Sequence, residues 1–133
     1  MGTTPGVKSK EFGCFWKSMF MVALCYPDSF DPKNTLHVTK RKNFKIYYKS
    51  LGKVIPCKFC REFITGTLEK RYPLDFSGRY QLFRSLYLWK DAVNKKLIRQ
   101  GNRSVKASPP LNTVITRYSK YLAHCDPIRG SCV

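Results

Sequence analysis

Acidic residues are scarce in this chain, which has 8 Asp and Glu against 25 Lys and Arg in 133 residues and a formal net charge of +17. An excess of this size implies an anionic partner or a charge-compensated assembly. Long apolar runs are missing as well, so we expect no membrane-spanning helix, and the first ten residues lack the apolar core of a secretion signal. We therefore expect a cytosolic protein, in which cysteines serve redox or metal chemistry more often than structural disulfides.

Strand-like alternation and internal repeats are also missing, and apolar residues recur instead at helical spacing. Hydrophobic residues make up 43% of the chain, enough for a single core. The expected fold is all-α, a compact bundle of four to five helices. These helices cover residues 12–26, 40–51, 56–70, 78–98 and 111–123. A flexible basic arm (residues 1–11) precedes the helical domain (12–123), and a cysteine-bearing tail (124–133) follows it.

Two cysteines one helical turn apart, Cys57 and Cys60, follow Pro56 at the start of the third expected helix. Proline is well tolerated at the first helical position. Residues three apart share a face of the helix, so the two sulfurs can meet. The helix dipole, Lys58 and Arg61 all favour thiolate, the reactive form of cysteine. The pattern predicts a redox site at a helix start.

Histidine is nearly absent, with two residues in the whole chain. A zinc site needs about four ligands, and no second well-spaced Cys or His pair accompanies the first. We therefore expect no metal, although half of a zinc site and buried structural thiols are alternative interpretations. Cys125 and Cys132 lie in the tail, where a loop with glycine and proline can close a disulfide on itself. Such a disulfide serves either as a staple or as a mobile relay.

Three stretches carry a resemblance to a known family. They are residues 16–27 (WKSMFMVALCYP), 56–63 (PCKFCREF) and 90–97 (KDAVNKKL). In this order and spacing they resemble the flavin-linked sulfhydryl oxidases of the Erv/ALR family, short forms of which occur in large DNA viruses. The likeness spans about residues 12–123.

The resemblance implies a helical bundle that holds FAD at one end and forms disulfides from thiols, with oxygen as acceptor and hydrogen peroxide as product. Cys60 would pass electrons into the flavin, and Cys57 would exchange with incoming thiols. Cys125 and Cys132 would form the shuttle disulfide of the family. The residues implied at the cofactor are Trp16, Tyr26, Val93 and Asn94, with Lys96 at the phosphates.

The chain departs from the family motifs at Phe20, which replaces a histidine, and at Lys90-Asp91, which replace His-Asn. In the family those groups pack around the adenine and ribose, so the departures motivate a second hypothesis. In that hypothesis the bundle has lost its flavin and serves as a basic structural protein, such as a minor capsid protein of a large DNA virus.

The partners expected from these two functions are protein thiols or virion proteins. The basic surface also makes contact with an acidic protein or a nucleic acid possible. Nucleic-acid binding as the main function is a third, weaker hypothesis. A homodimer is compatible with each function. The corresponding locations are the host cytoplasm or the virion.

Overall fold

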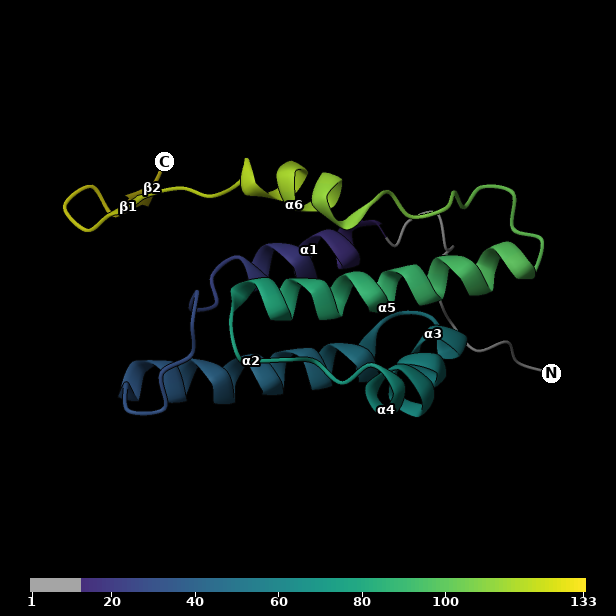
Figure 1. Cartoon of the computed structure of the whole chain (residues 1–133), viewed down its shortest axis with the longest axis horizontal. Coiled ribbons are helices and arrows are strands. Elements are labelled where there is room, and N and C mark those ends of the chain that lie inside the picture. The colour runs from purple at the N-terminus through teal and green to yellow at the C-terminus, as the bar shows by residue number, and fades with distance from the viewer. Residues whose placement is uncertain (1–12) are drawn as a thin grey trace.

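The computed structural model describes residues 13–133, so the predicted arm at residues 1–11 lies outside the described part of the chain. That part is mostly helical, which confirms the predicted all-α class (Figure 1). The elements are α1 (Gly13–Ala23), α2 (Thr35–Val54), α3 (Lys58–Phe63), the π-helical turn η2 (Ile64–Leu68), α4 (Glu69–Arg71), α5 (Arg79–Arg99), α6 (Leu111–Ser119), β1 (Cys125–Asp126) and β2 (Ser131–Cys132). No helix in residues 13–133 combines enough length with enough apolar character to span a bilayer.

Helix α2 begins earlier than the sequence pattern predicted because its N-terminus is capped. The side-chain oxygen of Asn34 accepts hydrogen bonds from the backbone N–H groups of Leu36 (3.0 Å) and His37 (3.3 Å). Asparagine is a favoured N-cap because its oxygen satisfies N–H groups that have no partner within the helix. The helix therefore starts at Thr35 and not at Lys40.

The third predicted helix begins at a cysteine and not at a proline. Cys57 is the N-cap of α3, with an extended backbone (φ −153°), and its Sγ accepts a hydrogen bond from the N–H of Cys60 (3.3 Å). The prediction that Pro56 occupies the first helical position is wrong, although the cysteine pair does lie at the start of the third helix. The predicted helix at 56–70 is α3, η2 and α4 in succession. π-helical turns of this kind are frequent near functional sites.

The core is built mainly by α1 and α5, which pack side by side (Figure 1). Leu82, Leu86 and Trp89 of α5 are almost completely buried. Burial of an aliphatic side chain of this size stabilises the fold by roughly 1.5–3 kcal/mol. The hydroxyl of Tyr48 on α2 donates to the carbonyl of Met19 on α1 (2.8 Å) inside this core. Helix α2 is thus joined to the bundle by a satisfied polar contact as well as by apolar packing.

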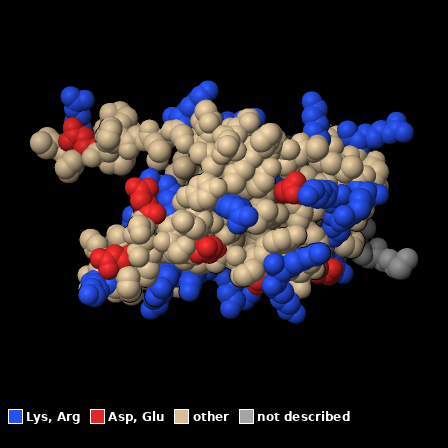
Figure 2. All heavy atoms as spheres, in the orientation of Figure 1, with Lys and Arg blue, Asp and Glu red and all other residues tan. Residues whose placement is uncertain are grey.

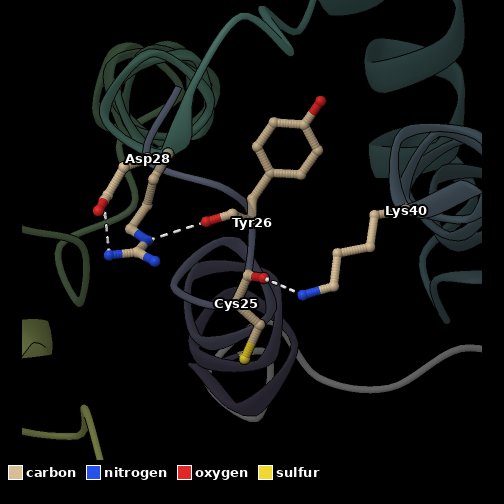
Figure 3. A network of polar contacts seen from close by, with 5 residues as sticks. Cys25, Tyr26, Asp28 and Lys40 are labelled. Carbon is tan, nitrogen blue, oxygen red and sulfur yellow. Dashed lines mark hydrogen bonds and ion pairs between the residues drawn. The ribbon is translucent and has the colours of Figure 1, made fainter. Parts of the chain in front are cut away.

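The connection between α1 and α2 is held by polar contacts from both long helices (Figure 3). Nε of Arg79, the first residue of α5, donates to the carbonyl of Tyr26 (2.9 Å), and the same guanidinium pairs with Asp28 (2.7 Å). Lys40 of α2 donates to the carbonyl of Cys25 (3.1 Å). These contacts fix the C-terminal end of α1 relative to α2 and α5.

The C-terminal tail forms a small antiparallel hairpin. Cys125 lies opposite Cys132, and a disulfide joins the two. His124 and Val133 exchange two backbone hydrogen bonds of 2.9 Å beside it. In Figure 1 the hairpin extends from α6 to one end of the molecule, whereas α3 lies toward the other end. The tail, predicted as a loop, therefore has regular structure.

Candidate functional site

A cavity of about 820 Å³ lies beside the Cys57–Cys60 pair. Pockets for small molecules and cofactors typically measure roughly 300–1,000 Å³, so this cavity accommodates one large organic ligand. Its walls come from the start of α1, from α3 and the residues on either side of it, from the second half of α5, and from the loop after α5. Most of the lining is apolar, with Trp16, Ile55, Phe59, Phe63, Ile64, Val93 and Leu97 as its larger side chains.

Helix α5 supplies one face of the cavity at helical spacing. Lys90, Val93, Asn94 and Leu97 follow one another within two turns and lie on one side of the helix. The amphipathic pattern of this segment predicted a single core-facing stripe. The N-terminal half of that stripe is core, and the C-terminal half is cavity wall.

The loop wall of the cavity is positioned by the way α5 ends. Gly101 has a left-handed backbone (φ 81°), its N–H donates to the carbonyl of Ile98, and the N–H of Asn102 donates to the carbonyl of Leu97, both at 3.0 Å. This pair of hydrogen bonds is the Schellman arrangement, in which glycine tolerates the positive φ that other residues avoid. The chain thereby leaves α5 and turns so that residues 104–107 line the cavity.

Two side-chain hydrogen bonds hold the far end of this loop on α5. The hydroxyl of Tyr87 donates to the carbonyl of Pro109 (2.6 Å), and Nδ2 of Asn94 donates to Oγ of Ser108 (2.9 Å). Both donors lie on a rigid helix. The loop wall is therefore fixed by residues that are distant from it in sequence.

Cys57 and Cys60 are half-buried thiols. Burial, with the hydrogen bond and the charge of Cys57 acting in the same direction, raises the pKa of Cys60 to about 12, although Lys96 and Arg61 lower it. Cys60 is therefore a protonated thiol at neutral pH. The prediction that the helix start and nearby cations favour thiolate is wrong for this sulfur, because desolvation outweighs the favourable charges.

Three lysines line the cavity, and no carboxylate is among its described lining residues. Nζ of Lys90 lies 5.3 Å from the centre of the Trp16 ring, and Nζ of Lys96 lies 4.3 Å from the centre of the Phe63 ring. Burial lowers the pKa of Lys90. Lys106 is the third lysine and comes from the loop. Flat apolar walls with uncompensated cations fit a ligand that has both aromatic rings and anionic groups.

The residues predicted for a cofactor pocket lie in two places. Tyr26 follows the C-terminal end of α1, is fully buried, and donates its hydroxyl to the carbonyl of Phe76 (2.6 Å). The cavity meets the other end of α1, about 16 Å away for a helix of 11 residues. Tyr26 therefore does not line it. The remaining predicted residues do line the cavity, namely Trp16, Val93, Asn94 and Lys96.

The positions that depart from the family motif also separate. Phe20 lies in the core, with its ring centre 4.8 Å from that of Phe83 and 5.1 Å from that of Tyr118, and it does not line the cavity. Asp91 pairs with Lys95 (2.8 Å) and is likewise outside the lining. Lys90 is thus the one substituted position that faces the cavity.

The second cysteine pair is not brought close to the first. The hairpin that holds Cys125 and Cys132 lies at the opposite end of the molecule from α3 (Figure 1). Direct exchange with Cys57 and Cys60 would require a movement of the tail or a second copy of the chain. The shuttle role of the tail disulfide stays a prediction.

Sequence reasoning missed most of the residues on the loop side of the cavity. Residues 101–110 fall between two predicted helices and were given no role, yet Ser104, Val105 and Lys106 line the cavity. The available signal was the position of the loop, since polar segments held by rigid elements often carry binding residues. Phe59, between the two cysteines, was not among the predicted site residues, yet it is 72% exposed and lines the cavity.

Residues 13–133 contain no group of three or more His, Cys, Asp or Glu side chains that could hold a metal ion. The functional interpretation depends on the geometry of the cavity and the cysteine pair, because no model of a known protein family matches the chain and no curated protein does either.

Proposed function

We propose that this chain is a FAD-dependent sulfhydryl oxidase, which forms disulfides from thiols and transfers the electrons to oxygen. The observation that carries the proposal is that Cys57 and Cys60 line a large, mainly apolar cavity that also contains lysines. Electron transfer from a dithiol to a cofactor requires the two to be held next to each other in a defined orientation. A cysteine pair in the wall of a ligand-sized cavity supplies that arrangement.

The chain's own chemistry in this proposal is thiol–disulfide exchange. With Cys57 and Cys60 joined in a disulfide, a substrate thiolate attacks Sγ of Cys57, the S–S bond breaks, and Cys60 leaves with the electron pair. Its raised pKa means that Cys60 then takes up a proton. A second substrate thiolate attacks the substrate sulfur of the mixed disulfide, which releases Cys57 and a substrate disulfide. Cys57 leaves as a thiolate and also takes up a proton, so the pair now holds the two electrons and, in effect, the two protons that the substrate thiols lost on ionisation. FAD, held by Trp16, Val93 and Lys96, would supply the route for these electrons and protons to oxygen, with hydrogen peroxide as product.

The residues that line the cavity fit FAD in kind. The rings of Trp16 and Phe63 offer flat surfaces for isoalloxazine or adenine stacking, and Val93 adds apolar contact. Lys90 and Lys96 offer ammonium groups to the two phosphates. No carboxylate among the described lining residues opposes those negative charges.

The first test uses the full chain incubated with FAD and passed over a gel-filtration column. We expect the protein to retain flavin and to lose visible flavin absorbance when dithiothreitol is added without oxygen. In air it should release hydrogen peroxide in equal amount to the disulfide formed. A protein that retains no flavin, or whose flavin is reduced no faster than free FAD, would refute the proposal.

Matched cysteine variants separate the cavity thiol from other thiols. Cys60 lines the cavity, whereas Cys25 is exposed at the end of α1 and is not in the lining. Cys60→Ala should bind flavin but abolish its reduction by thiols, and Cys25→Ala should behave as the unmodified chain. Equal activity in both variants would remove Cys60 from the reaction.

Matched lysine variants test the phosphate contact. Lys95 and Lys96 are neighbours on α5, but only Lys96 lines the cavity. A hydrogen bond to a charged group contributes about 1.5–3 kcal/mol, so Lys96→Gln should weaken FAD binding by about tenfold or more. Riboflavin lacks the phosphates and should bind Lys96→Gln and the unmodified chain alike. Lys95→Gln should leave both affinities unchanged.

A flavin-free structural role is the second candidate, and the raised pKa of Cys60 favours it. A cysteine that is protonated at neutral pH is a weak nucleophile and a poor leaving group. In this case the cysteine pair stabilises the start of α3, and the chain serves as a basic component of a larger assembly, such as a minor capsid protein. A colourless protein that cannot be reconstituted with FAD would favour this function.

A further inference from the structure

Helix α2 presents a line of positive charge on its outer side. The helix contains six basic residues and no acidic one. Four of them recur at intervals of three or four residues, are exposed, and therefore lie on one face. At about 1.5 Å of rise per residue this line is about 16 Å long. We refer to it as the lysine stripe, formed by Lys42, Lys45, Lys49 and Lys53.

The orientation of α2 keeps the lysine stripe at the surface. Tyr48 and Gly52 are buried against the bundle, whereas all four stripe lysines are exposed, so the stripe borders the packed side of α2 and stays open to solvent. In Figure 2 Lys and Arg side chains follow the lower edge of the molecule, the edge along which α2 runs in Figure 1. The stripe is therefore available to a partner along the outer side of α2.

No stripe lysine forms an ion pair with a described residue, although the Glu69 carboxylate lies beside Gly52 of the same helix. Lys45 lies 5.6 Å from the centre of the Phe76 ring, a contact that leaves its charge without a counter-ion. Like charges one turn apart on a helix repel one another and destabilise it. An anion bound along the stripe removes this repulsion. The ion pairs within residues 13–133 are Arg79–Asp28, Lys95–Asp91 and Arg129–Asp126.

We propose that the lysine stripe binds the phosphate backbone of a nucleic acid without sequence preference. Duplex DNA carries about one negative charge per 1.7 Å of helix axis when both strands are counted, so the length of duplex beside a stripe of about 16 Å carries about nine phosphate charges. Four exposed lysines in a row can therefore each meet a phosphate without reading the base sequence. A lipid surface fits less well, because membrane-binding amphipathic helices need a broad apolar face beside the lysines. Here the apolar side of α2 packs on the bundle, and the exposed apolar residues beside the stripe, Val38, Ile46 and Val54, are eight residues apart and do not form a broad apolar face.

The proposal is independent of the oxidase function, and salt dependence tests it. The probe is a short fluorescent duplex DNA of mixed sequence, titrated with the full chain at several KCl concentrations and followed by anisotropy. Each phosphate contact contributes about 0.9 to the slope of log affinity against log salt. Replacement of all four stripe lysines by glutamine should therefore reduce the magnitude of that slope by about 3–4.

A charge-matched control distinguishes the stripe from net charge. Glutamine at four exposed basic positions on α5, α6 and their surroundings lowers the net charge from +17 to +13, as the stripe variant does (17 − 4 = 13). This control variant should keep most of the slope of log affinity against log salt that the unmodified chain shows. Equal loss in both variants would overturn the proposal, because it would show that charge acts diffusely. The control positions are Arg84, Arg103, Arg117 and Lys120.

Three further outcomes are decisive. Absence of binding to the duplex at low salt would overturn the proposal. Tighter binding to polyglutamate or to phosphatidylserine vesicles than to DNA at the same salt would overturn it too, since it would identify an acidic protein or a lipid surface as the partner. Lys42→Gln combined with Lys49→Gln should reduce the slope by about half as much, about 1.8. That double variant serves as the test if the fourfold variant does not fold.

Discussion

Gly52 lies where α2 and η2 come closest to each other, and Gly52→Ala tests whether this close packing positions the cavity wall. A Cβ atom at residue 52 would lie 2.9 Å from Cγ2 of Ile64, well inside the roughly 3.5–4.0 Å at which carbon atoms pack best. Ile64 is 1% exposed and lines the cavity together with Cys60. Its side chain has little room to turn away, so the added methyl group must push η2 from α2.

Two opposing contributions set the size of the effect. Alanine is a better helix former than glycine by about 1 kcal/mol, whereas an extra methyl group in a filled core costs about 1–3 kcal/mol. Gly52→Ala should therefore lower the free energy of unfolding by about 0–2 kcal/mol. Gly66, within η2, has nothing within 4 Å of an added Cβ. Gly66→Ala gains the helix preference alone and should stabilise by up to about 1 kcal/mol.

Urea unfolding of the two alanine variants measures the difference, which should be about 1–3 kcal/mol. Ile64→Leu removes Cγ2, so in a double-mutant cycle it should recover part of the loss in Gly52→Ala, with a coupling of at least about 0.5 kcal/mol. If Gly52→Ala stabilises the protein as much as Gly66→Ala does, the reasoning about this contact is refuted.

Three further changes have expected outcomes. Cys60 should react slowly with iodoacetamide at neutral pH and faster as the pH rises toward about 12, because its raised pKa keeps the thiolate scarce. Peptide mass spectrometry measures the labelling rate, and rapid labelling at neutral pH would contradict the burial of this thiol. Tyr48→Phe removes the hydrogen bond from the Tyr48 hydroxyl to the carbonyl of Met19, which keeps its partner within α1, and should cost about 0.5–1.5 kcal/mol in urea unfolding. No loss of stability would show that this hydrogen bond does not stabilise the contact between α1 and α2. The double variant Cys125→Ser, Cys132→Ser lacks the disulfide of the exposed hairpin. It should shift the calorimetric Tm by no more than about 2 °C and should speed proteolysis of the tail. A larger shift in Tm would show that the hairpin stabilises the bundle.

The long helices could be predicted from the sequence because their signals are local and repeated. The segment predicted at 78–98 is α5 (Arg79–Arg99), and its apolar spacing persists over more than five turns. Helix starts were less predictable, because a cap depends on a single hydrogen bond. Asn34 lay outside the predicted helices and was given no role, and Pro56 was preferred to Cys57 as a helix start. The same residue type occurs both in turns and at helix starts, and only the backbone conformation around it shows which role it has.

The candidate site was predicted in part, for a related reason. The proximity of Cys57 and Cys60 followed from helix geometry, because the two are one turn apart, whereas Val93, Asn94 and Lys96 were named as site residues only through the resemblance to the oxidase family. The loop wall depends on hydrogen bonds to Pro109 from Tyr87 and to Ser108 from Asn94, which join residues 14 to 22 positions apart. Tyr26 is a buried aromatic residue either way, and only the packing shows that its surroundings are core and not cavity.

Lys90 is the residue at which stability and binding make opposite demands. A partly buried ammonium group costs folding free energy, and burial accordingly lowers the pKa of Lys90. Its described contacts are an oxygen of Asn94 at 3.4 Å and the ring of Trp16 at 5.3 Å, and neither is an acid. A methionine or leucine at that position would serve the bundle better if the cavity were only a packing defect. Polar residues that weaken a fold locally are typical of functional sites. Phe20, at the other position where the resembled family has a histidine, lies in the core and does not line the cavity. The cation at Lys90 nevertheless supports the proposal that the cavity binds an anionic ligand.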